Sequence, residues 1–129
     1  MIADKIRTRW SAQVRTDVAL DPELLRLMAD SGCHTLFIGF ESVNPRTLEE
    51  YNKKQALKDI VYCIKAVKYH GIRIHGMFVL GAETDDVETI HKTVDFAKDL
   101  AIDTVQIMIL TPLPGTPLFN HMMKSGRLL

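Results

Sequence analysis

The fold of this chain is decided by residues 76–81, Gly-Met-Phe-Val-Leu-Gly, an apolar run with a glycine at each end. A short apolar run without polar alternation is typical of a strand buried on both faces, as in a parallel sheet covered by helices. Residues 84–86, Thr-Asp-Asp, offer helix N-cap side chains, and residues 87–100 then repeat apolar residues at helical spacing. The sequence therefore predicts a strand, a loop and a helix, with a ligand near residues 81–86 at the carboxyl end of the strand.

The rest of the chain repeats this alternation. Apolar patterns predict further strands at residues 8–15, 34–40 and 103–110. Capping and breaking residues predict helices at 22–31, 46–51, 57–70, 87–100 and 117–124. Strands that alternate with helices, and that leave no room for hairpins, predict a single α/β domain over residues 1–129 with a parallel sheet and right-handed crossovers.

Composition narrows the classes of partner and compartment. The 129 residues include 16 basic and 16 acidic side chains, so no net field recruits nucleic acid or an anionic membrane. No apolar run approaches the roughly 20 residues that cross a bilayer, and we expect a soluble, cytoplasmic protein. Cys33 and Cys63 lack metal-ligand spacing, and we expect two buried thiols, with no metal-ligating residue in the chain.

Polar side chains recur at one edge of the predicted sheet. Gln13 and Arg15 lie at the end of the first strand, and Glu41 follows the second. Charges at the ends of buried strands need a partner, so Arg15 and Glu41 form either a structural ion pair or part of a ligand site. His75 is equally a core histidine or a functional one. Lys53 lies in a loop, where it is either solvated or close to an anionic ligand.

Common catalytic and phosphate-binding motifs are absent. The chain contains no GxGxxG, no GxxxxGK[ST] and no GxSxG. The residues alone therefore indicate an α/β unit, smaller than the roughly 250 residues of a closed eight-fold barrel, with a polar ligand site.

Four stretches, in order, resemble the later half of the barrel in radical S-adenosylmethionine (SAM) enzymes. Residues 10–15 (WSAQVR) resemble the third strand of that barrel, and residues 39–42 (GFES) the end of the fourth. Residues 76–81, with residues 84–86 behind them, resemble the fifth strand, and residues 109–117 (ILTPLPGTP) the sixth strand and its loop. The resemblance is to the branch that often carries a cobalamin-binding domain. It implies a partial (β/α) TIM-type barrel of about four parallel strands.

The resemblance also implies a set of SAM-binding residues. Glu41 and Ser42 match the position that contacts the ribose, where a carboxylate accepts from two hydroxyls. Lys53 falls where relatives often have an arginine near the methionine carboxylate. Gln13 and Arg15 match a strand-end pair facing the same pocket.

The adenine side of that implied site lies on the last two strands. Residues 78–81 match a segment that packs near adenine, and residues 110–112 match a strand end whose backbone reads the adenine edge. At Met77 some relatives carry an acid that contacts the ligand. The full implied set is Gln13, Arg15, Glu41, Ser42, Lys53, Met77, Phe78, Gly81, Leu110, Thr111 and Pro112.

The sequence departs from the family at its amino terminus. The CxxxCxxC loop that binds the [4Fe-4S] cluster is missing, and so is the Gly-Gly-Glu stretch. Two cysteines cannot replace three thiolates that converge on one cluster. We therefore interpret the chain as strands three to six of a longer enzyme. SAM and [4Fe-4S], with cobalamin as an option, belong to that parent, and we expect this chain alone to retain none of them and to contain no catalytic residue.

Two other functions compete with this interpretation. The chain could be a stand-alone, non-catalytic α/β module that binds a nucleotide-like ligand or a partner protein. It could also be a barrel enzyme of another superfamily, for which Glu41, His75 and Lys53 are the acid and base residues on offer. The fragment interpretation carries a partner prediction: the missing amino-terminal half of the barrel, or a second copy that pairs through exposed strand edges into an eight-stranded assembly.

Overall fold

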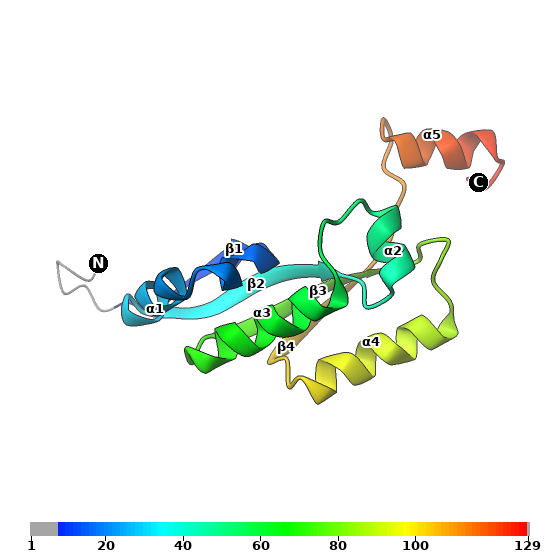
Figure 1. The fold of residues 1–129 in the computed structure, drawn as a ribbon. Helices are drawn as coiled ribbons and strands as arrows, with labels where there is room; N and C mark the ends of the chain where they lie inside the picture. The colour runs from blue at the N-terminus through cyan, green and yellow to red at the C-terminus, as the bar shows by residue number, and fades with distance from the viewer. Residues whose placement is uncertain (1–7, 129) are drawn as a thin grey trace.

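The structure is a computed structural model that describes residues 8–128. Its four strands are β1 (Trp10–Val14), β2 (Cys33–Glu41), β3 (Arg73–Leu80) and β4 (Thr104–Ile109). They form one sheet in the order β1-β2-β3-β4, and every neighbouring pair is parallel (Figure 1). The predicted α/β class and parallel sheet are confirmed.

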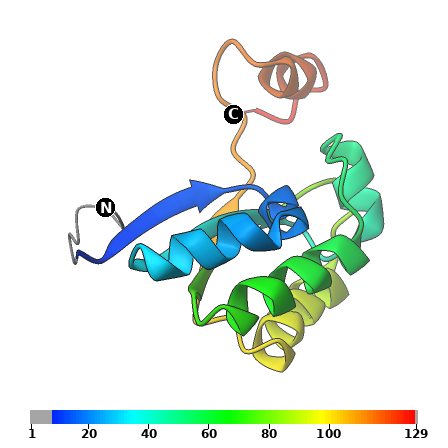
Figure 2. The same cartoon turned by 60° about the vertical axis from the view of Figure 1, so that its left-hand side comes forward.

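Helices follow the strands in alternation. The α-helices are α1 (Pro22–Asp30), α2 (Pro45–Glu50), α3 (Leu57–Tyr69), α4 (Val87–Asp99) and α5 (Pro117–Lys124), and a short 3-10 helix, η1, spans Thr16–Leu20. Figure 2 shows α1, α3 and α4 side by side on one face of the sheet. None of the described helices is long and apolar enough to span a bilayer.

The hydrophobic core lies between the sheet and these helices. Leu36, Ile38 and Phe40 of β2 are fully buried on this side, as are Ile74 and Phe78 of β3. Burying a side chain of this size stabilises a fold by roughly 1.5–3 kcal/mol, so these residues fix which face of each strand turns inward. The helical residues that pack against them include Leu25, Ile60, Ile64 and Val67.

The opposite face of the sheet is only partly buried, which differs from the sequence prediction for β3. His75, Met77 and Val79 alternate with fully buried neighbours and are themselves half-buried. The apolar run predicted a strand covered on both faces, but no described helix covers this second face. The polar alternation that usually marks such a face is absent here, because two of its three residues are apolar.

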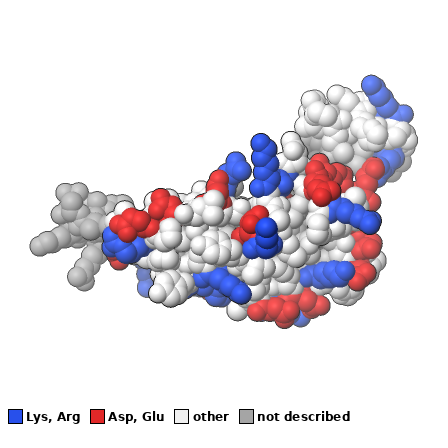
Figure 3. All heavy atoms as spheres, in the orientation of Figure 1, with Lys and Arg blue, Asp and Glu red and all other residues white. Residues whose placement is uncertain are grey.

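The carboxyl-terminal part of the chain packs loosely. Every residue of β4 is exposed, and α5 has no buried residue. Figure 1 shows α5 standing away from the sheet, beyond the carboxyl ends of the strands. Charged side chains of both signs are interspersed on the surface in Figure 3, as the equal numbers of basic and acidic residues lead one to expect.

Candidate functional site

The carboxyl ends of the four strands share one edge of the sheet, because all four are parallel. At the β1 and β2 ends this edge contains a cavity of about 170 Å³. Small-molecule sites usually enclose about 300–1,000 Å³, so this cavity has the size of part of a site. Its lining includes Gln13, Arg15, Gly39, Glu41, Lys53, Lys54 and Gln55.

Glu41 is held in an unusual conformation at the end of β2. Its φ angle is 66°, in the left-handed region that costs a non-glycine residue roughly 1–3 kcal/mol, and the β2–β3 register shifts between Gly39 and Glu41. A Cβ on Gly39 would lie 2.7 Å from Glu41 Oε1. Glycine at position 39 therefore lets the carboxylate fold back over the strand.

Lys53 is the ionic partner of Glu41. The Lys53 ammonium donates to Glu41 Oε1 at 2.8 Å, and the Glu41 side chain is only 19% exposed. Arg15 was one expected partner, but its Nε lies 3.7 Å from Asp17 and its side chain is 82% exposed. Of the two alternatives left open by the sequence, the structural Arg15–Glu41 ion pair is therefore wrong, because the loop after α2 brings a closer cation to Glu41.

That loop, residues 52–55, is bonded to the end of β2 and to the start of η1. The Gln55 side-chain amide donates to the Phe40 carbonyl at 3.0 Å and accepts from the Thr16 hydroxyl at 2.7 Å. The Lys53 backbone N–H donates to the Leu48 carbonyl at 2.9 Å. Sequence reasoning missed Gln55, because a single amide in a loop has no spacing that marks it.

The tips of β3 and β4 lie next to each other. Gly81 follows β3 with a φ of 105°, and its N–H donates to the Asp85 carboxylate at 2.9 Å. The Leu110 N–H donates to the Leu80 carbonyl at 2.7 Å. Backbone groups of both tips therefore face the same edge as Glu41, outside the lining of the small cavity.

The other residues of the implied set are placed differently. Ser42 is fully buried, and its hydroxyl accepts from the Asn44 N–H at 3.0 Å. The Phe78 side chain is fully buried on the helix side, with its ring centroid 5.7 Å from that of Phe40. Met77 is half-buried on the opposite face of β3, and Thr111 donates to the Ile109 carbonyl. Pro112 is half-buried in the loop that follows β4.

His75 lies on the uncovered face of the sheet, where its side chain contacts neighbouring strands. Its Nδ1 lies 2.8 Å from the Thr104 hydroxyl, and its ring centroid is 4.7 Å from that of Phe37. These contacts give it neighbours on both β2 and β4, away from the strand tips.

Tyr51, which follows α2, was not singled out from the sequence. Within residues 8–128, its hydroxyl is a buried side-chain oxygen that has no hydrogen-bond partner. Burial raises the pKa of Tyr51 to about 12, and the carboxylates of Asp85, Glu50 and Glu41 reinforce this shift. The phenol therefore stays neutral beside the site.

The described residues do not fit an iron–sulfur cluster. Cys33 and Cys63 are both buried, in β2 and α3 respectively, and burial raises the pKa of each thiol, to about 12 for Cys63. Cluster binding requires several thiolates that converge on one point. No group of three His, Cys, Asp or Glu side chains in residues 8–128 could hold a metal ion.

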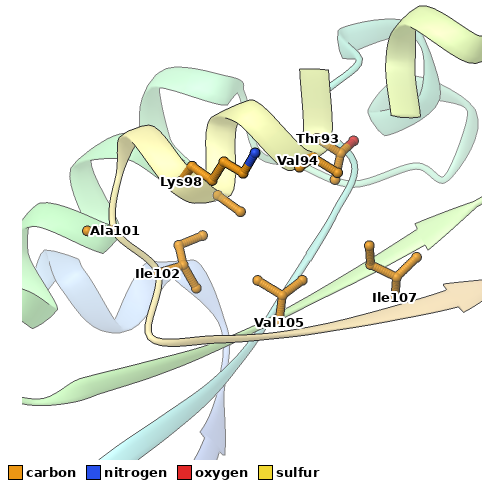
Figure 4. Close-up of a pocket in the computed structure, with 8 residues that line it drawn as sticks. Thr93, Val94, Lys98, Ala101, Ile102, Val105 and Ile107 are labelled. Atoms are coloured by element: carbon orange, nitrogen blue, oxygen red, sulfur yellow. The ribbon is translucent and has the colours of Figure 1, made fainter. Parts of the chain in front are cut away.

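A larger groove of about 490 Å³ lies on the helix side of the sheet, between α4 and β4. In Figure 4, Val105 and Ile107 of β4 point toward α4, with Ile102 beside them. The lining of this groove is mostly apolar. Its polar side chains are Lys98 and Thr93, and the Thr93 hydroxyl already donates within α4. The edge that carries Glu41 offers more polar groups to orient a small ligand and is therefore the stronger candidate site.

Comparison with known proteins agrees with this architecture. Residues 3–97 match the family model described as the radical SAM superfamily. The chain is 34% identical over 119 residues to bacteriochlorophyllide d C-12(1)-methyltransferase of Chlorobaculum tepidum. The aligned region covers 92% of this chain and 26% of that protein. It thus spans about a quarter of the length of the curated relatives it matches.

Solved structures give the same fold. Elp3 of Methanocaldococcus infernus superposes with a TM-score of 0.77 at 19% identity, over 93% of this chain and 28% of that one. TsrM of Kitasatospora setae is a radical SAM methyltransferase that was solved with cobalamin and a [4Fe-4S] cluster. It also superposes with a TM-score of 0.77 at 19% identity, over 91% of this chain and 23% of TsrM. The expected partial TIM-type barrel is confirmed, and because the family model covers more than half of its residues, the chain belongs to the radical SAM superfamily.

Proposed function

We propose that this chain is the SAM-binding half of the barrel of a longer radical SAM enzyme, and that alone it is catalytically inactive. The Glu41–Lys53 pair carries the proposal. Its ions lie 2.8 Å apart at the shared edge of four parallel strands, where α/β proteins bind their ligands. The strained backbone of Glu41 supports a binding role, because strain of this kind gathers at ligand sites.

Each group has a chemical match in SAM. The Glu41 carboxylate can accept hydrogen bonds from the two ribose hydroxyls, and the Lys53 ammonium can pair with the methionine carboxylate. Lysine lacks the bidentate fork of arginine, so Lys53 orients that carboxylate less strictly. Gln13 and Arg15 lie in the same cavity lining. In the proposed complex, adenine would lie against the backbone at the tips of β3 and β4, near Gly81 and Leu110.

The proposed parent would hold its cluster on an amino-terminal segment that precedes β1. When bound there, SAM is the source of the 5′-deoxyadenosyl radical that such enzymes use. Cobalamin is an option for the parent, since TsrM was solved with it. The amino-terminal half would be the natural partner of the β1 edge, and the two free, buried cysteines fit a reducing compartment such as the cytoplasm.

A titration followed by NMR tests SAM binding, because chemical shifts detect weak complexes. We expect millimolar SAM to shift the amide signals of Gln13, Glu41, Lys53 and Gly81. Glu41→Gln should weaken binding about tenfold, the size expected for a lost charged hydrogen bond. Glu49→Gln, which removes the same charge from an exposed position in α2, should bind like the wild type. Unchanged signals at these residues would refute the proposal.

One observation favours a second candidate, a stand-alone module for a nucleotide-like ligand. A nucleotide also carries ribose hydroxyls for Glu41 and anionic groups for Lys53, so the same ion pair could bind it. The same titration with ATP separates the two functions. Tighter binding of ATP than of SAM would favour the module, whereas preference for SAM favours the barrel half.

A further inference from the structure

A hydrogen-bonded network links α2 to the loop between β3 and α4. The Thr47 hydroxyl donates to Asp85 Oδ1 at 2.8 Å, and Asp85 Oδ2 accepts from the N–H groups of Gly81 and Ala82 at 2.9 and 3.1 Å. The Asn44 amide donates to the Thr84 carbonyl at 2.9 Å. Asp85 therefore joins the end of β3 to a helix that follows β2.

The Thr47–Asp85 bond is buried at its Thr47 end and half-buried at Asp85. Thr47 is fully buried, although α2 has only six residues. A hydrogen bond to a charged group contributes roughly 1.5–3 kcal/mol, more than one between neutral groups. Thr84 extends the contact, with its hydroxyl 2.9 Å from that of Thr47 and 3.0 Å from Glu50 Oε2.

Helix capping does not account for Asp85. The N-cap of α4 is Asp86, whose carboxylate accepts from the Thr89 N–H at 2.7 Å. Asp85 directs one carboxylate oxygen to the strand end and the other to α2. Its position therefore fixes the β3 tip relative to α2, with no bond to the helix that follows.

The same helix carries the other side of the candidate site. The Lys53 N–H donates to the carbonyl of Leu48, the residue that follows Thr47. A shift of α2 would therefore move Lys53, and with it the ionic partner of Glu41. Gly81 is thus linked through Asp85 and Thr47 to α2, and α2 is bonded through Leu48 to Lys53.

We propose that Thr47 and Asp85 are positioning residues that hold the Gly81 side and the Lys53 side of the site in one fixed arrangement. The inference rests on the proposed SAM site, but the mechanical link itself does not require a ligand. It assigns a role to two residues that do not line the cavity.

The test combines amide exchange without ligand and SAM affinity, measured on the whole chain. Thr47→Val removes the hydroxyl, Thr47→Ser keeps it, and Thr93→Val is the matched control. Thr93 is also a buried threonine, and its hydroxyl donates within α4 at 2.8 Å. We expect Thr47→Val to speed exchange of the Gly81 and Lys53 amides together about tenfold.

The same variant should weaken SAM binding about tenfold, and Thr47→Ser should restore both properties. Thr93→Val should keep wild-type affinity even where its loss of stability equals that of Thr47→Val. If Thr47→Val speeds exchange at Gly81 and leaves Lys53 unchanged, the positioning role is refuted. If the wild type binds no SAM, the proposed function is refuted. The exchange measurement needs no ligand, so it still tests whether Thr47 and Asp85 couple Gly81 to Lys53.

Discussion

At the scale of single residues, Glu41 belongs both to the fold, as the turn at the end of β2, and to the proposed site. Its left-handed backbone turns the chain at the end of β2, and the absent side chain of Gly39 leaves space for its carboxylate. A residue chosen only for stability at this φ would be glycine or asparagine. The carboxylate is thus maintained at a cost to stability, as expected for a binding group.

The unpaired hydroxyl of Tyr51 leads to a stability prediction. Tyr51→Phe removes a buried oxygen that has no hydrogen-bond partner, and such groups cost roughly 1–3 kcal/mol. We expect the free energy of unfolding to rise by about 1 kcal/mol, measured by urea denaturation. Tyr62→Phe, at a residue that is 52% exposed, should have no effect. A lower stability of Tyr51→Phe would mean that the hydroxyl has a partner, such as an ordered water.

The buried thiol of Cys63 predicts sensitivity to alkali. Burial, helped by the Asp17 carboxylate, raises its pKa from 9.0 to about 12. The folded state therefore favours the neutral thiol, and its contribution to stability is complete below about pH 9. Between pH 9 and about pH 12 the unfolded chain loses this proton and the folded chain keeps it, so stability falls by up to about 1.4 kcal/mol per pH unit.

Urea denaturation at several pH values tests whether stability falls as the pH rises. The difference in stability between the wild type and Cys63→Ala should narrow as the pH rises from 8.5 to 10.5, because only the wild type loses the contribution. Cys33 is present in both proteins, so its contribution cancels in the difference in stability. Parallel curves for the two proteins would contradict the pKa shift.

At the scale of elements, α4 depends on its N-cap. The Thr89 N–H and hydroxyl both bond to Asp86 and hold the pKa of its carboxyl below the ordinary value of 3.8. The charged cap therefore stabilises the helix above about pH 4, and this contribution is lost as the pH falls through the lowered pKa. Asp86→Ala should lower the thermal midpoint by a few degrees at pH 7, because two hydrogen bonds disappear.

Two further variants make the capping test specific. Asp86→Asn keeps a capping oxygen without a titrating group, so it should retain most of the stability at pH 7 and lose less of it in acid. Asp95→Ala removes an exposed aspartate from the middle of α4 and should leave the midpoint unchanged. Equal effects of Asp86→Ala and Asp95→Ala would rule out the cap.

Most elements could be predicted from the sequence, because their signals are local. The helix at residues 117–124 begins and ends as expected, and β2 and β4 differ from prediction by one residue at each end. The 3-10 helix η1 was missed, since it packs on α3 rather than following a local pattern. The Glu41–Lys53 pair and the Thr47–Asp85 bond were also missed, because each joins residues whose distance depends on the complete fold.

At the scale of the whole molecule, the sheet has two open edges among the described residues. β1 and β4 each pair with one neighbour, and β4 exposes Val105, Ile107 and Ile109 by 39%, 46% and 71%. Unpaired edges with apolar side chains favour pairing with another chain. We expect this chain to self-associate, with a molar mass that rises with concentration in light scattering.

A charge on the edge strand tests this expectation. Ile107→Lys should shift the population toward monomer, because lysine on an edge strand opposes pairing. Ile90→Lys is the matched control, since Ile90 is similarly exposed, by 44%, but lies on α4. A wild-type chain that stays monomeric at several hundred micromolar would contradict the predicted association.

The order β1-β2-β3-β4, in which spatial neighbours are also successive along the chain, has an evolutionary consequence. Every strand pairing here is made within one β-α-β step, so the sheet can grow or shrink by whole steps without rethreading the polypeptide. Gene duplication and recombination can therefore exchange such steps as units. Glu41, at the tip of one step, contacts Lys53 in the loop before the next helix, so both residues of this ion pair, and with them half of the proposed binding site, are inherited together.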